Sequence, residues 1–318
     1  MSLRARSFLL LALALASGAA LAQSPEALEW LRRIHDATQK LSYKGVFVYQ
    51  HDGRTETSRI THFVDSAREV EKLEVLDGQP REIVRTGETV KCYLPEARVV
   101  KVDRRSGERG FPALLPEQVT ELARHYDIAL GGTRRVSGFD CRAVVLTPRD
   151  NLRYGYRLYA DTTSGMLLKA VTFDSTGHDV EQFMFTQLAL GSVTRDMVKP
   201  RHNGAGWRVE DAAAAPASLA GWGLSAELPG FRKVVELKRR LESKPVGQMV
   251  YSDGLAAVSV FIEPMEGRPS VRTGLASMGA INIYTRQVAD HMVTVVGDTP
   301  AVSVQRIADA VEYRRPAQ

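Results

Sequence analysis

Several features are absent from this sequence, and each absence excludes a class of protein. Beyond residue 22, no stretch approaches the roughly 18 consecutive apolar residues that a membrane-spanning helix needs. Basic residues are not gathered into patches, and the formal net charge is only +5, of which Arg4 and Arg6 near the N-terminus contribute two. This small net charge and the absence of basic patches argue against a nucleic-acid-binding protein.

Sequence motifs of catalysis are also missing. There is no nucleophile elbow, no phosphate-binding glycine loop, no zinc-binding helix motif and no cysteine pair at metal-ligand spacing. The histidines are scattered singly, which is typical of solvated surface groups, and no carboxylate stands in an apolar setting that would raise its pKa. The sequence therefore predicts a binding protein rather than an enzyme, with no metal and no cofactor.

The first 22 residues resemble a secretory signal. Arg4 and Arg6 precede an apolar run from Phe8 to Ala16, and Ala20-Leu21-Ala22 fits the small-x-small cleavage pattern. No cysteine follows the apolar run, so a lipid-modified N-terminus is not expected. We predict a signal peptide over residues 1–22 and a soluble protein exported to the periplasm.

The only two cysteines, Cys92 and Cys141, lie in the strand-like segments VKCYL and CRAVVL. In an oxidising compartment a disulfide between them is a candidate. The alternative is two buried free thiols, and the sequence does not decide between them because it does not give the pairing geometry.

The stretch from Arg153 to Leu190 predicts three antiparallel strands. The runs Arg153–Ala160, Met166–Asp174 and Val180–Leu190 are joined by turns at Asp161–Gly165 and Ser175–Gly177. In the second and third runs both faces carry apolar side chains. A sheet with one solvated face would alternate instead, so we expect both faces of this sheet to be covered.

The flanking sequence predicts an α+β protein of two domains. A helix is expected from Ser24 to Leu41, and a second helix is expected to begin at Pro116-Glu117 and end before Asp127. Short strands with glycine turns fill the rest of the chain up to residue 147, the pattern of a curved antiparallel sheet. After residue 220 the pattern indicates a smaller antiparallel sheet with one helix after Thr299-Pro300. We predict a half-barrel domain over residues 23–195, a linker over 196–220 and an α+β domain over 221–318.

Aromatic and aliphatic side chains are more numerous in the first domain than one sheet face needs. One interpretation is that helices pack on the curved sheet and fill it. The other is a partly filled sheet whose apolar cavity buries acyl chains at about 0.8 kcal/mol per CH₂. The candidate cavity residues are Phe47, Tyr49, Tyr154, Tyr156, Leu158, Phe173, Phe183 and Phe185.

Several segments resemble the RseB/MucB family of periplasmic negative regulators of the envelope-stress sigma factor. In the first domain these are YKGVFVY, LDGQPREIVR, KCYLP and TPRDNLRYGYRLYADTTSGMLLK, and in the second YSDGLAAVSVFIEP and VTVVGDTP. The resemblance spans nearly the whole chain after the signal. It implies a lipoprotein-carrier-like half-barrel joined to a smaller C-terminal domain.

The same resemblance implies a function. The protein would bind the periplasmic region of a transmembrane anti-sigma factor and protect it from proteolysis. Lipid-bearing signals, namely lipopolysaccharide or lipoprotein acyl chains, would release it, and the protein would self-associate as a homo-oligomer. The alternatives are a periplasmic carrier chaperone for lipoproteins or lipids, and an envelope hydrolase, which the missing motifs disfavour.

Overall fold

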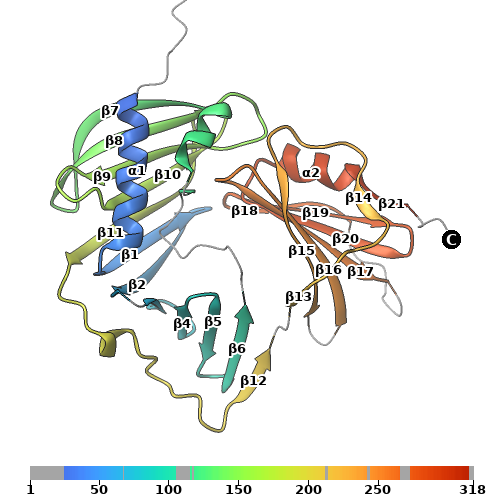
Figure 1. Ribbon diagram of the computed structural model, residues 1–318, viewed down its shortest axis with the longest axis horizontal. Helices are drawn as coiled ribbons and strands as arrows, with labels where there is room; N and C mark the ends of the chain where they lie inside the picture. Colours follow the sequence, from blue (N-terminus) through green and yellow to red (C-terminus); the bar gives the residue numbers. More distant parts are fainter. Residues whose placement is uncertain are drawn as a thin grey trace, which may run out of the picture.

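The computed structural model of the protein describes residues 25–66, 68–104, 115–116, 118–211, 214–241, 244–265 and 273–314. The predicted signal peptide over residues 1–22 lies outside this part of the chain. The described residues form two large sheets, each with an α-helix packed on it, and a separate two-stranded ribbon. Figure 1 shows the two large sheets side by side. The predicted α+β class with a large curved sheet and a smaller second sheet is confirmed.

The first sheet has twelve strands among the described residues, in the order β12-β6-β5-β4-β3-β2-β1-β11-β10-β9-β8-β7. All neighbours are antiparallel except β12, which lies parallel to β6. The strands are β1 (Tyr43–His51), β2 (Arg54–Val64), β3 (Glu69–Val75), β4 (Arg81–Thr86), β5 (Thr89–Leu94), β6 (Val99–Arg104), β7 (Tyr126–Val136), β8 (Phe139–Pro148), β9 (Gly155–Asp161), β10 (Leu167–Phe173), β11 (Asp179–Leu190) and β12 (Arg208–Asp211).

Strands β9, β10 and β11 confirm the predicted three-stranded unit. Both turns contain a glycine with positive φ, Gly165 at 78° and Gly177 at 87°, where glycine has no Cβ to clash with the backbone. The two faces are also covered as expected, because five of the seven β10 residues are buried.

Helix α1 (Pro25–Lys40) covers the strands at one end of this sheet, where it contacts β7, β8 and β10. Its buried stripe consists of residues at helical spacing, including Ala27, Leu31 and Ile34. The segment predicted as a second helix near residue 116 is the short 3₁₀ helix η1 (Val119–Arg124). This helix has only six residues and ends just before β7 begins, so there is little room for a series of α-helical hydrogen bonds. Short connections of this kind typically form 3₁₀ turns.

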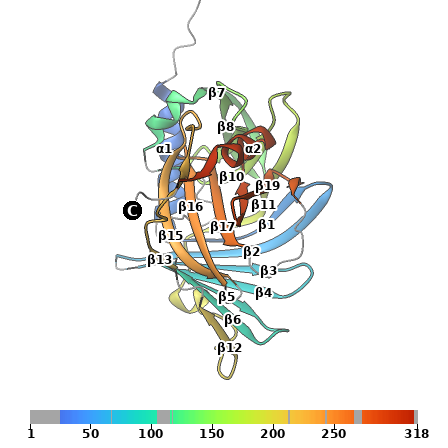
Figure 2. The same cartoon turned by 90° about the vertical axis from the view of Figure 1, so that its right-hand side faces the viewer.

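The second sheet has the order β13-β15-β16-β17-β20-β19-β18, and helix α2 (Ala301–Ala310) packs on β19 and β20. Figure 2 shows β15, β16 and β17 in front of the first sheet. A separate ribbon pairs β14 (Trp222–Leu224) with β21 (Val311–Tyr313). The strands of the sheet are β13 (Ala214–Pro216), β15 (Arg232–Leu241), β16 (Lys244–Ser252), β17 (Ala257–Pro264), β18 (Gly274–Met278), β19 (Ile281–Val288) and β20 (His291–Gly297).

The predicted linker over residues 196–220 contains regular structure. After η2 (Arg195–Val198), the chain crosses the outer face of the first sheet, where Trp207 packs against the cluster of Val84, Tyr93 and Val100. It then adds β12 to the first sheet and β13 to the second. The low apolar content of this stretch predicted an irregular chain, whereas backbone pairing at two sheet edges needs little apolar content.

Candidate functional site

The predicted cavity residues are packed together rather than arranged around an open space. Six of the eight are buried in the main core, and Tyr49 packs against that core. Phe47, Phe183 and Phe185 meet edge to face, with ring centroids 5.1 Å to 6.1 Å apart. Such contacts are typical of a dense interior.

Phe173 is the exception among the eight. It is half-buried on the opposite side of β10, where the guanidinium of Arg157 lies 5.0 Å from the centre of its ring. Phe173 also covers Gly155, since a Cβ built on Gly155 would lie 2.2 Å from the tip of the ring. The sequence pattern alone did not separate this residue from the core group.

A small cavity of about 90 Å³ remains between the two domains. Its lining includes Tyr49, Tyr156 and Phe183 from the first domain and Leu255 and Ala280 from the second. Binding pockets for small molecules usually have about 300–1,000 Å³. Among the described residues, therefore, the predicted cavity candidates leave no room for an acyl chain.

A larger hollow of about 710 Å³ lies on the second domain. Trp222, His291 and Tyr313 form an aromatic wall there, with ring centroids 5.0 Å and 5.1 Å from that of Trp222. None of the eight predicted cavity residues lines this hollow.

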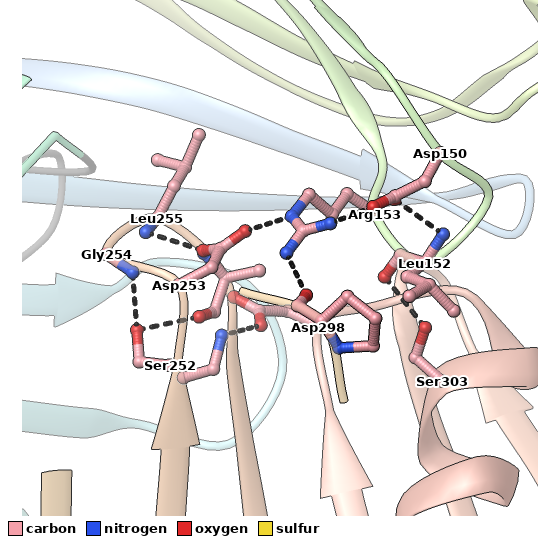
Figure 3. Close-up of polar contacts among 12 residues, drawn as sticks. Asp150, Leu152, Arg153, Ser252, Asp253, Gly254, Leu255, Asp298 and Ser303 are labelled. Carbon is pink, nitrogen blue, oxygen red and sulfur yellow. Dashed lines mark hydrogen bonds and ion pairs between the residues drawn. The ribbon is translucent and has the colours of Figure 1, made fainter. Parts of the chain in front are cut away.

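The junction between the domains is centred on Arg153, whose side chain is 0% exposed. Its Nε donates to Asp253 Oδ2 at 2.6 Å, its Nη2 donates to the carbonyl oxygen of Pro229 at 2.6 Å, and its Nη1 donates to Asp150. Figure 3 shows the guanidinium between Asp150 of the first domain and Asp253 of the second. A buried guanidinium needs such partners, because an uncompensated buried charge is strongly unfavourable.

The carboxylate of Asp253 has two roles, because it pairs with Arg153 and also stabilises its own turn. Its Oδ1 accepts the backbone N–H groups of Leu255 and Ala256 at 2.9 Å and 2.8 Å. An Asp-Gly pair such as Asp253-Gly254 by itself indicates only a hairpin turn. The same carboxylate therefore fixes the turn and pairs with the guanidinium of the other domain.

Two further buried hydrogen bonds join the domains. Asn282 donates from Nδ2 to the hydroxyl of Tyr154 at 3.0 Å, and Ser303 donates to the carbonyl oxygen of Leu152 at 2.7 Å. At the other end of the junction, Arg239 of β15 donates to Asp103 of β6 at 3.1 Å. These contacts set the relative placement of the two sheets.

Sequence reasoning missed this junction. Arg153 was predicted only as the first residue of a strand, and Asn282 and Ser303 were not singled out. The available signal was a charged residue between the apolar Leu152 and Tyr154, but the partner of such a charge lies about a hundred residues away and cannot be read from spacing.

A second buried polar group lies on β1, β2 and β3. His62 is 1% exposed, and its ring nitrogens lie 2.8 Å from the carbonyl oxygen of Leu41 and 3.1 Å from Glu69. This hydrogen bond lowers the pKa of Glu69, whereas burial raises the pKa of the neighbouring Glu71 to about 7. The expectation that no carboxylate lies in a setting that raises its pKa is therefore wrong for Glu71. The prediction that lone histidines are surface groups is wrong for His62, because the pairing of β2 with β1 and β3 brings a carbonyl and a carboxylate to its ring.

The predicted disulfide is not formed. Cys92 on β5 and Cys141 on β8 are both free, and seven strands lie between β5 and β8 in the sheet. Cys141 is fully buried, and burial raises the pKa of its thiol to about 12. The alternative of free thiols therefore describes this structure, with Cys92 half-buried.

The described residues contain neither a metal-binding cluster nor a membrane-spanning helix. No group of three or more His, Cys, Asp or Glu side chains there could hold a metal ion. Within the same part of the chain, no helix has the length and apolar character to cross a bilayer.

Comparison with known proteins identifies the family. Residues 26–202 match the family model of the MucB/RseB N-terminal domain, and residues 216–312 match that of the MucB/RseB C-terminal domain. The chain belongs to the MucB/RseB family. The interval between the two matches lies within the segment predicted as a linker, which contains β12.

MucB/RseB relatives are similar over nearly the full chain. The sigma factor AlgU regulatory protein MucB of Pseudomonas aeruginosa is 32% identical over 93% of this chain and 94% of its own. The sigma-E factor regulatory protein RseB of Escherichia coli is 24% identical over 89% of each chain. Both relatives are named as regulators of sigma factors.

Solved MucB structures share the fold. The crystal structure of MucB in complex with MucA(peri) has a TM-score of 0.71 and 30% identity, and covers 91% of this chain and 99% of that one. The crystal structure of MucB has a TM-score of 0.66, also at 30% identity. The similarity thus includes both domains.

Proposed function

We propose that this chain regulates a sigma factor in the periplasm by binding the periplasmic part of a transmembrane anti-sigma factor. The observation that carries this proposal is the similarity to MucB in its complex with MucA(peri). The match covers 99% of that MucB chain, so both domains of the partner-binding relative have a counterpart here. A signal peptide over residues 1–22 would deliver the chain to the periplasm, and we propose no catalytic activity.

Binding would protect the anti-sigma factor from proteolysis by mass action. A protease acts on the free fraction of its substrate, and that fraction falls as 1/(1 + [L]/Kd) for a single site. At a free concentration of this chain of about 100 times Kd, cleavage would slow on the order of a hundredfold.

We further propose that lipid-bearing signals act at the domain junction. The small cavity lies there, with apolar side chains of both domains in its wall. Acyl chains of lipopolysaccharide or of lipoproteins would need to widen it by moving the domains apart. Such coupling requires only that the lipid binds the separated arrangement better than the closed one.

The free energy gained by burying an acyl chain is large enough to offset the loss of the Arg153–Asp253 pair. About ten CH₂ groups moved out of water would contribute about 8 kcal/mol. Separating the domains would return both charges of this pair to water, which costs less than removing one partner and leaving the other buried, a change that costs about 3–5 kcal/mol. One acyl chain could therefore offset the loss of the central junction contact.

The alternative of a lipid or lipoprotein carrier has less support. A carrier holds its cargo in a preformed space, and the candidate cavity residues of the first domain are packed in its core. The junction also fixes a second domain that a simple carrier would not need.

Isothermal titration tests the proposal. The chain without residues 1–22 is titrated with the purified periplasmic domain of the anti-sigma factor from the same organism, and saturable one-site binding is expected. The periplasmic domain of an unrelated membrane protein serves as the control. The proposal is refuted if the anti-sigma domain gives no heat of binding in the titration and does not co-elute with the chain in size-exclusion chromatography.

Lipid coupling needs a separate titration. Purified lipopolysaccharide is added to the preformed complex, with a non-ionic detergent at the same micelle concentration as the control. We expect lipopolysaccharide to raise the Kd for the anti-sigma domain at least tenfold. An unchanged Kd at saturating lipopolysaccharide would remove lipid sensing from the account and leave anti-sigma binding intact.

A further inference from the structure

Two sheets present four outer edges among the described residues, and three of these edges carry features that oppose further pairing. Strand β12 has four residues, three of them charged, and β13 has three residues and ends at Pro216. Strand β7 is interrupted by a register shift at Gly131-Gly132 and carries Arg134 and Arg135. Short length, charge, proline and bulges are the devices by which proteins block strand edges.

The fourth edge, β18, is longer than β12 and β13 and has no bulge in its pairing with β19. Its sequence GLASM contains no charge and no proline. Leu275 is 50% exposed and Met278 is 52% exposed. Within the described residues β18 pairs only with β19, so one backbone edge and two apolar side chains remain open to a partner.

The register defines which backbone groups face outward. Met278 pairs with Ile281 across the two residues Gly279 and Ala280, and Gly279 has φ of 58°. Glycine with positive φ at the first central position is the signature of a type II′ hairpin turn, in which the flanking residues exchange hydrogen bonds. Because bonded and non-bonded pairs alternate along an antiparallel ladder, Leu275 and Ser277 direct their N–H and C=O groups to the open edge.

We propose that β18 is a strand-addition site for an extended segment of the anti-sigma factor's periplasmic part. This inference rests on the proposed function and specifies its contact. In strand addition the main-chain hydrogen bonds supply affinity and side-chain contacts supply selectivity. The segment would be extended, with apolar residues placed against Leu275 and Met278.

The end of β18 leads directly to a hollow of about 670 Å³ on the first domain. The N–H of Gly279 donates to Asp52 Oδ2 at 2.5 Å, and that of Ala280 donates to Glu181 Oε2 at 3.4 Å. Both carboxylates line the hollow, together with Asp179, Arg54 and His51. A lysine or arginine after the added strand would fit this acid-rich lining.

This continuity favours a different polypeptide over a second copy of the chain. Two β18 strands paired antiparallel around a two-fold axis would leave the two hollows at opposite ends of a five-residue strand, about 17 Å apart. Neither hollow would be filled by that pairing. A single extended segment would occupy the edge and the hollow together and contact both domains, so its affinity would depend on their relative placement.

Two matched variants test the edge. Ser277→Pro removes one outward N–H and leaves the β18–β19 hydrogen bonds in place, since proline is tolerated at strand edges. Ser277→Ala keeps this N–H and, like the proline variant, loses the hydroxyl hydrogen bond to Asn282. We expect Ser277→Pro to raise the Kd for the anti-sigma periplasmic domain at least tenfold and Ser277→Ala to change it less than threefold.

Hydrogen exchange of the wild-type complex provides a measurement that needs no variant. Peptides covering residues 274–278 should exchange more slowly when the anti-sigma domain is bound, because the N–H groups of Leu275 and Ser277 gain acceptors. A merely structural role for β18 would leave this exchange unchanged on binding.

The outcomes separate the two proposals. If the wild-type chain does not bind the anti-sigma domain, the proposed function fails and this inference fails with it. If the wild type binds but Ser277→Pro has the wild-type Kd and exchange in residues 274–278 is unaffected, only the strand-addition site is refuted. If Ser277→Pro dissociates a homodimer and leaves the anti-sigma Kd unchanged, the edge belongs to a second copy and the present assignment is wrong.

Discussion

Replacement of Arg153 by methionine is the sharpest test of the domain junction. Methionine retains the apolar stem of arginine but removes the guanidinium from Asp253, whose side chain is 0% exposed. A buried charge left without its partner costs about 3–5 kcal/mol. At about 2–4 °C per kcal/mol for domains of 150–250 residues, the thermal midpoint should fall by about 6–20 °C.

A second substitution determines whether charge is the cause. Asp253→Asn removes the negative charge and retains an oxygen for the N–H groups of Leu255 and Ala256. Because the double variant leaves no buried charge without a partner, it should recover at least half of the lost midpoint. Differential scanning calorimetry of the wild type, both single variants and the double variant measures this cycle.

An exposed ion pair of the same type is the control. Arg149 and Asp127 lie 2.9 Å apart with both side chains 45% exposed, so Arg149→Met should change stability by less than about 1 kcal/mol. The reasoning is refuted if Arg153→Met is no more destabilising than Arg149→Met. It is also refuted if the double variant is as unstable as Arg153→Met alone.

Three other predictions concern the first domain. Phe185→Ala should cost about 3–5 kcal/mol in denaturant unfolding, because Phe185 is 0% exposed, whereas an open cavity would make this change nearly neutral. Burial raises the pKa of Glu71 from 4.5 to about 7, so the folded state holds its proton more tightly than the unfolded chain and loses stability as pH rises through this range. Glu71→Gln should therefore stabilise the protein above pH 7 and have no effect below pH 4, and a Tm gain that persists at pH 4 would contradict this. Cys92 and Cys141 are free, so thiol titration of the unfolded chain should find two thiols without reductant, and dithiothreitol should not change Tm.

Local patterns predicted the elements of the fold well. The apolar stripe of α1 and the glycine turns at Gly165 and Gly177 depend on near neighbours in the chain, and the structure contains them where the sequence places them. Strand β18 was missed, because GLASM is short and has neither β-branched residues nor alternation. The order of the strands was beyond prediction, since pairing of β1 with β11 joins residues more than a hundred positions apart.

The candidate site was harder to predict than the fold. The surplus of aromatic residues was correctly noted, but periodicity does not distinguish an interior filled by neighbouring side chains from an open one. Phe183 and Phe185 fill the interior of the first domain through contacts with Phe47 on another strand. The Arg153–Asp253 pair depends on the docking of two domains, a contact that no local pattern encodes.

The short connection between β12 and β13 limits how the two domains can move. Asp211 ends a strand of the first sheet and Ala214 begins a strand of the second, so three peptide links allow their Cα atoms to lie at most about 11 Å apart. Figure 1 shows this corner at the lower end of the molecule, away from β9 and β10. If the contacts between the domains break, the ends of β12 and β13 would still lie within about 11 Å of each other, so the two sheets would remain tethered at this corner.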